Sequence, residues 1–175
     1  MSSLTPDRRI QALLDTLRRS FDGDAWHGPA LADALRGVDA QHAIAHPVSG
    51  AHSIWELTLH LAAWTREVAR RLSGTVPAEP TEGDWPNGAT APDAVAWDAA
   101  RASLNAARDQ LLRAVAALPP DQLDRSLPRP ESTGDSAGVP TYAVMLTGLA
   151  EHNAYHGGQI ALLRRALGVP PSTTR

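Results

Sequence analysis

The chain has 175 residues, of which 43% are hydrophobic, and it carries a formal net charge of −3. It is therefore long enough for one domain with a buried core. This slightly acidic balance, without a block of basic residues, argues against a surface that follows a phosphate backbone, and we expect no nucleic-acid partner. The sequence shows neither a signal peptide nor the ~18–20 consecutive apolar residues of a membrane span. We expect a cytoplasmic protein with no membrane partner.

Hydrophobic residues recur at helical spacing along most of the chain, and no segment alternates as a strand would. The first helix is expected to begin at Thr5 and Pro6, a cap followed by a proline in the first turn. Its apolar face would consist of Ile10, Leu13, Leu17 and Phe21. A loop and a short helix are expected to follow within residues 23–38.

The second long helix is expected to begin at Ser53, because Ser53 and Glu56 match the capping-box pattern. Gly74 would end it, and a loop rich in proline and glycine would follow over residues 74–93. The apolar stripe of this helix would consist of Ile54, Leu57, Leu61, Trp64 and Val68.

The third and fourth helices are expected over residues 92–118 and 141–167, separated by a long irregular connection. The stripe of the third would contain Trp97, Ala100, Leu104, Ala107, Leu111 and Leu118. We find no repeat and no second domain, so residues 1–175 are expected to form a single all-α domain. Because a simple up-and-down bundle has short loops, the sequence predicts a four-helix bundle with long crossover connections.

Two histidines interrupt the apolar stripe of the fourth predicted helix, where His152 and His156 follow Met145 and Leu149. Residues four apart lie on one face of a helix, with Cβ atoms roughly 6 Å apart, so both imidazoles can reach one ion. His60 borders the stripe of the second helix and can converge on this pair. Three histidine ligands leave an open coordination position, which a catalytic metal needs. From spacing alone, a metal site and a set of satisfied core histidines remain alternatives.

Two absent residue types narrow the chemistry. The sequence contains no cysteine, which excludes disulfides, thiolate ligands and a cysteine nucleophile. It contains no lysine, which excludes a lysine Schiff base. A thiolate would therefore have to arrive with a cosubstrate.

The segments "HSIWELTLHLAAW" (52–64) and "HNAYHGGQIALLRRALG" (152–168), with the "GDWP" loop (83–86) between them, resemble the DinB-like family of bacterial metalloproteins. The resemblance implies a DinB/YfiT-like four-helix bundle. It also implies one divalent metal ion, zinc or nickel, held by His60, His152 and His156. Some relatives transfer low-molecular-weight thiols such as bacillithiol or mycothiol.

Other side chains are candidates for supporting roles. Gln159 and Glu56 are candidates for orienting an imidazole or a bound water, with Glu56 alternatively a helix cap. Trp64, Trp85 and Tyr142 are candidates for the walls of a ligand pocket. His52 is about 12 Å along the helix axis from His60, too far to share an ion, and is expected to cap the helix.

We expect a metal-dependent enzyme that transfers a low-molecular-weight thiol to a small-molecule electrophile. A metal-dependent hydrolase and a non-catalytic, stress-related bundle that binds metal or ligand are the alternatives. Helix 92–118 has more small apolar residues than one core face needs, so a homodimer is also expected.

Overall fold

The computed structural model describes residues 7–87, 93–129 and 138–170. Within these ranges the chain forms helices and no strand. The elements are α1 (Arg8–Phe21), α2 (Leu31–Leu35), α3 (Ala40–Ile44), α4 (Ile54–Arg71), α5 (Ala94–Ala116), the 3₁₀ helix η1 (Pro120–Asp124) and α6 (Tyr142–Ala166). The short helix α3 was not expected from the sequence.

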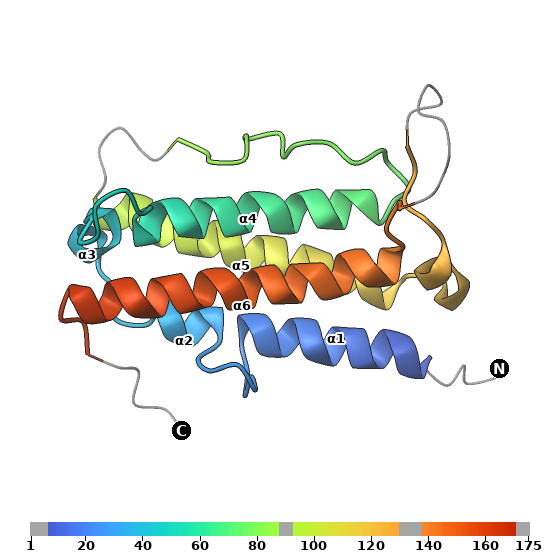
Figure 1. Cartoon of the computed structure of the whole chain (residues 1–175), viewed down its shortest axis with the longest axis horizontal. Coiled ribbons are helices and arrows are strands. Elements are labelled where there is room, and N and C mark those ends of the chain that lie inside the picture. Colours follow the sequence, from blue (N-terminus) through green and yellow to red (C-terminus); the bar gives the residue numbers. More distant parts are fainter. Residues whose placement is uncertain (1–6, 88–92, 130–137, 171–175) are drawn as a thin grey trace.

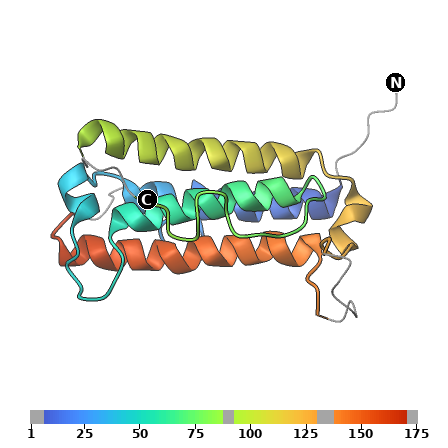
Figure 2. The same ribbon diagram turned by 90° about the horizontal axis from the view of Figure 1, so that it is seen from above.

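The four long helices form a bundle in which each packs on two neighbours. Helix α4 packs on α5 and α6, and α1 packs on α6 and α5. Helices α1 and α6 run in one direction and α4 and α5 in the other (Figures 1 and 2). Because α4 and α5 are parallel, the chain that leaves α4 returns along the length of that helix (Figure 1). The prediction of an all-α bundle with a long crossover is confirmed. The second long connection is not a crossover, because α5 ends and α6 begins at the same end of the bundle (Figure 1).

Local signals set the ends of the helices. The capping box of α4 is present: Ser53 Oγ accepts from the Glu56 backbone N–H at 3.2 Å, and Glu56 Oε2 accepts from the Ser53 N–H at 2.7 Å. Helix α1 begins later than the sequence suggested, at Arg8, because the Asp7 carboxylate caps it. Thr5 and Pro6 lie outside the described residues. Past α4, Gly74 has a φ of +83°, a backbone conformation that favours glycine.

The core contains the predicted stripes except for two residues, because Trp64 of α4 and Leu13 of α1 are only partly buried. In α1 the buried residue is Leu14 rather than Leu13, which is only partly buried. Polar side chains also lie inside the bundle, and two of the three candidate ligands, His60 and His156, are among them. None of the helices in the described ranges is both long enough and apolar enough to cross a membrane.

Candidate metal centre

The bundle brings His60, His152 and His156 together between α4 and α6. Each offers one ring nitrogen, and these nitrogens all lie within 4.8 Å of one another. The Nε2 atoms of His60 and His152 are 3.0 Å apart, and the ring centroids of His152 and His156 are 4.4 Å apart. His60 and His156 are 4% and 6% exposed, so the cluster is largely removed from water.

Hydrogen bonds from Nδ1, the ring nitrogen on the side away from the cluster, fix the orientation and tautomer of His60 and His156. His60 Nδ1 donates to the backbone carbonyl of Asp84 at 2.6 Å, and His156 Nδ1 donates to Gln159 Oε1 at 2.8 Å. A neutral imidazole with its proton on Nδ1 has its lone pair on Nε2. The Nε2 atoms of His60 and His156 are therefore available as ligands, an arrangement typical of histidines at metal sites.

His152 completes a donor set of neutral nitrogens. Burial, and then the neighbouring His156 and His60, lowers the pKa of His152 to about 4. Burial also lowers the pKa of His156. His152 Nδ1 is buried without a hydrogen-bond partner in the described part of the chain, which costs free energy. The three imidazoles can supply the ligands of one metal ion.

The lowered pKa of His152 predicts how the stability of the metal-free protein changes with pH. Between about pH 4 and the ordinary value of 6.5, the unfolded chain binds a proton at this position that the folded protein does not bind. Stability should therefore fall as the pH drops through this window, and the loss should be complete near pH 4. Urea unfolding of the chelated protein at pH 7.5 and pH 5 measures it. His152→Gln should flatten the profile, and an unchanged slope in this variant would contradict the assignment.

The sequence did not single out Asp84, although it belongs to the "GDWP" loop. Its carbonyl accepts from His60, while its carboxylate accepts from Trp64 Nε1 at 2.7 Å. The Asp84 backbone N–H donates to Glu79 Oε1 at 3.1 Å. These contacts anchor the crossover segment on α4 and place the carbonyl that orients His60. A loop sequence does not reveal where one backbone oxygen will lie, so only the motif itself could have drawn attention to Asp84.

Asp84→Ala is expected to lower the metal affinity roughly ten-fold, the lower end of the range for partners that orient ligands. The carbonyl remains in this variant, but the segment that holds it loses its bond to Trp64. Trp64→Phe should lower the metal affinity by a similar factor. The double variant should bind the metal no more weakly than either single variant, because both changes remove the same hydrogen bond. Titration with a competing chelator measures all three. Additive losses would show that the two side chains act separately.

Trp85 lies against the histidine cluster as part of a stack of three rings. Its indole stacks on His60 at 4.1 Å and on His52 at 3.5 Å, in both cases nearly parallel. Two parallel rings whose centroids are this close to that of the indole cannot share one of its faces, so His52 and His60 cover opposite faces. Trp85 remains 37% exposed, so it forms part of the outer wall of the site. His52 does not cap α4 as expected, because Ser53 does.

Two other residues that the sequence suggested for the site, Glu56 and Tyr142, do not lie at the histidine cluster. The Glu56 carboxylate contacts His46 Nε2 at 3.1 Å and His52 Nδ1 at 3.4 Å, and it has no hydrogen bond or ion pair to the three clustered histidines. It acts as the cap, not as an orienting group for the cluster. Tyr142 is buried at the first turn of α6, about 15 Å along the axis from His152. It therefore packs in the core and does not line a pocket at the histidines.

Fold and site together define a helical-bundle protein with a three-histidine group that can hold a metal ion. The profile of the DinB superfamily matches residues 24–160, which include all three histidines and the Asp84 segment. The chain belongs to the DinB superfamily. Comparison with curated proteins and with solved structures gives no match.

Proposed function

We propose that the protein is a metal-dependent enzyme that activates a low-molecular-weight thiol at the three-histidine centre and transfers it to a small electrophile. The convergence of three imidazoles carries the proposal, because three protein ligands leave a position for an exchangeable group. Zinc or nickel is the proposed ion, since imidazole nitrogen suits both. A bound divalent ion supplies Lewis acidity, which lowers the pKa of a coordinated thiol. The chain has no cysteine, so the thiol belongs to a cosubstrate.

A groove beside the cluster offers room for the electrophile. It has a volume of about 410 Å³ and is lined by Trp64, Arg71, Pro77, Ala78, Glu79 and Asp84. Trp64 lies between the groove and the histidine cluster. Its ring centroid is 6.5 Å from that of His152, and the Arg71 guanidinium carbon lies 5.5 Å from the centroid of the indole. The indole thus provides an apolar wall between the groove and His152, whereas Arg71 is already paired with Glu67 at 2.7 Å. The wall suits an electrophile with an apolar body.

Hydrolysis is the second candidate, but the position of Asp84 makes it weaker. Its carboxylate is the acidic group nearest to His60 among the described ion pairs, at 3.4 Å from Nδ1. It therefore lies on the Nδ1 side of the ring, away from Nε2, and it already accepts from Trp64. A general base for water should face the reacting position instead.

The test uses protein loaded with one equivalent of zinc or nickel and a panel of electrophiles, each with glutathione, cysteine, bacillithiol or mycothiol. Turnover that requires a thiol and disappears in His156→Ala supports the proposal. His27→Ala is the control, because His27 is an exposed loop residue remote from the cluster in sequence. Turnover without thiol identifies a hydrolase. No turnover, together with a large loss of thermal stability on chelation, identifies a structural metal.

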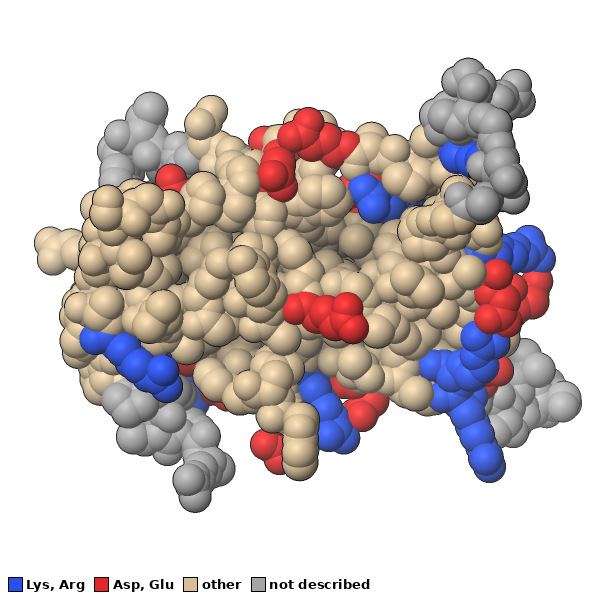
Figure 3. Space-filling view, in the orientation of Figure 1, with Lys and Arg blue, Asp and Glu red and all other residues tan. Residues whose placement is uncertain are grey.

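We also propose that the protein is a homodimer, and the exposed side chains favour the outer face of α6 over α5. Val144, Tyr155 and Leu162 are 59%, 66% and 58% exposed on α6. The face shown in Figure 3, which α6 crosses, carries one acidic side chain at its middle, while most other charged groups lie toward its edges. The exposed Glu151 lies on the same side of α6 as the three apolar side chains. A helical face with large apolar side chains and a single charge is suited to an isologous contact.

Light scattering is expected to give twice the chain mass, and Leu162→Arg to give the monomer. The matched change on α5, Val95→Arg, should leave the dimer intact. The reverse result would place the interface on α5, and a monomeric wild-type protein at millimolar concentration would rule out the dimer.

A further inference from the structure

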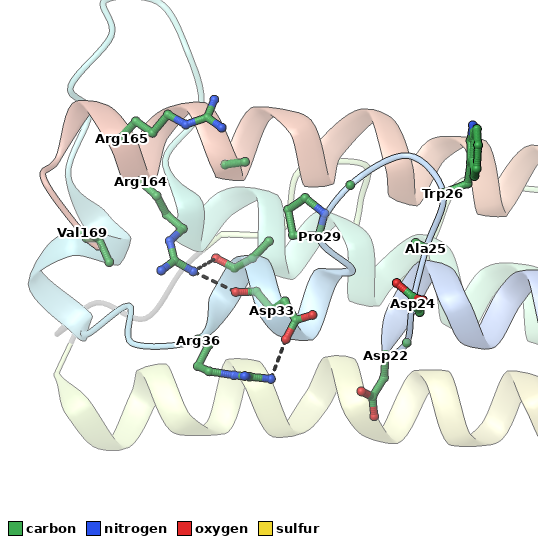
Figure 4. Close-up of a pocket in the computed structure, with 14 residues that line it drawn as sticks. Asp22, Asp24, Ala25, Trp26, Pro29, Asp33, Arg36, Arg164, Arg165 and Val169 are labelled. Carbon is green, nitrogen blue, oxygen red and sulfur yellow. Dashed lines mark hydrogen bonds and ion pairs between the residues drawn. The ribbon is translucent and has the colours of Figure 1, made fainter. Parts of the chain in front are cut away.

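A second cavity lies on another side of the bundle, between the α1–α2 loop, α2 and the end of α6. Its volume is about 1180 Å³. Figure 4 shows its lining residues, which come from residues 22–36, from the last turns of α6 and from Val169 just beyond that helix. Arg164 in its wall is about 12 Å along α6 from His156. The cavity contains none of the three clustered histidines, so it is separate from the candidate metal centre.

One end of the cavity is cationic. Arg164 is 5% exposed, and its NH1 group donates to the backbone carbonyls of Asp33 and Ala34, each at 2.8 Å. Its NH2 group donates to the carbonyl of Pro170. These partners are neutral, and no carboxylate in the described residues forms an ion pair with Arg164. Burial and the nearby Arg36 lower the pKa of this guanidinium. A buried cation without a carboxylate partner is costly, and an incoming anion would offset that cost.

The three hydrogen bonds of Arg164 do not use all of its N–H groups. A guanidinium carries five N–H donors, and these three hydrogen bonds use three of them. Two N–H groups remain for a ligand. Because guanidinium geometry matches carboxylate and phosphate groups, this end of the cavity suits a single anionic group.

The opposite end of the cavity has the opposite charge. Figure 4 shows Asp22, Asp24 and Trp26 along the loop on the side away from Arg164 and Val169, with Trp26 apart from the two carboxylates and Pro29 nearer to Arg164. Asp22 is paired with Arg108 at 3.5 Å, so Asp24 is the carboxylate that can meet a ligand. Trp26 is fully exposed, with a relative accessibility of 103%. A carboxylate and an open indole face both attract an organic cation. A dianion that spans the cavity would be repelled at this end.

We propose that this cavity binds an elongated zwitterionic small molecule, with its carboxylate at Arg164 and its ammonium group at Asp24 and Trp26. A short peptide with free termini has this chemistry, and its middle would lie along the apolar Pro29. The complementary charges at the two ends set the direction in which the ligand binds. The site is independent of the metal centre and of the reaction proposed there.

Trialanine with free termini is the probe, measured by calorimetry on the metal-loaded protein. Acetylation of its N-terminus or amidation of its C-terminus removes one charge, and each should weaken binding roughly ten-fold, as for loss of a charge-assisted hydrogen bond. Equal binding of the three peptides, or no binding of any at millimolar concentration, would overturn the proposal.

Two exposed substitutions test the protein side without disturbing the core. Asp24→Asn and Trp26→Ala should each weaken binding of free trialanine about three- to five-fold, the range of an exposed cation–π contact. Both should have little effect on the N-acetylated peptide, which lacks the cation. Asp98→Asn, on the exposed face of α5, is the matched control and should bind as the wild type does. If the two loop variants bind free trialanine like this control, the ammonium group is not held there and the proposal fails.

Discussion

Replacing any one of His60, His152 and His156 by alanine is expected to remove most of the bound metal. The loss of a residue that only orients a ligand lowers metal affinity about 10–100-fold, so the loss of a ligand should exceed ~100-fold. The ring nitrogens of the three histidines lie within 4.8 Å of one another, so two remaining imidazoles cannot surround the ion as three do. Metal content after gel filtration, measured by mass spectrometry, gives the result directly.

His42→Ala leaves the cluster untouched, because His42 pairs with Asp39 near the start of α3. It should retain one equivalent of metal. If the triple alanine variant of the clustered histidines also retained a full equivalent, the ion would be bound elsewhere and the proposed reaction would lose its centre.

Trp97→Ala is expected to destabilise the protein by about 3–5 kcal/mol, as is usual when a large buried aromatic side chain is removed. Trp97 is 2% exposed and packs against Trp55, with ring centroids 5.3 Å apart. Its Nε1–H donates to the Val38 carbonyl at 2.7 Å, which ties α5 to the segment before α3. The variant loses both the packing and this bond. Thermal unfolding should show a decrease in Tm of roughly 6–20 °C for a chain of this size.

Val95→Ala, in the same turn of α5, is the matched control. Val95 is 78% exposed, so its truncation should change the stability by no more than about 0.5 kcal/mol. A loss below 1 kcal/mol for Trp97→Ala would mean that the first turn of α5 is not part of the cooperative core.

The sequence by itself determined the four long helices of this protein and the position of the three clustered histidines on them. Helical periodicity, the Ser53–Glu56 capping box and the glycine after α4 are local signals. Each can be recognised in the sequence without knowledge of how the helices pack. They placed His60 beside one buried stripe and His152 and His156 on another. The absence of cysteine, which restricts the chemistry, is also a property of the sequence alone.

The tertiary structure alone decided which other groups accompany the histidines. The path of the crossover segment along α4 brings the Asp84 carbonyl to His60 and inserts Trp85 between two imidazoles, whereas Glu56 turns to His46 and His52. No residue pattern reports such a path, because contacts made across the bundle select it. The cationic end of the second cavity has the same origin: the charge of Arg164 is met by carbonyls of α2, some 130 residues away in the sequence. Periodicity gives the face on which a side chain lies, but the partner that it meets there depends on how distant segments pack together.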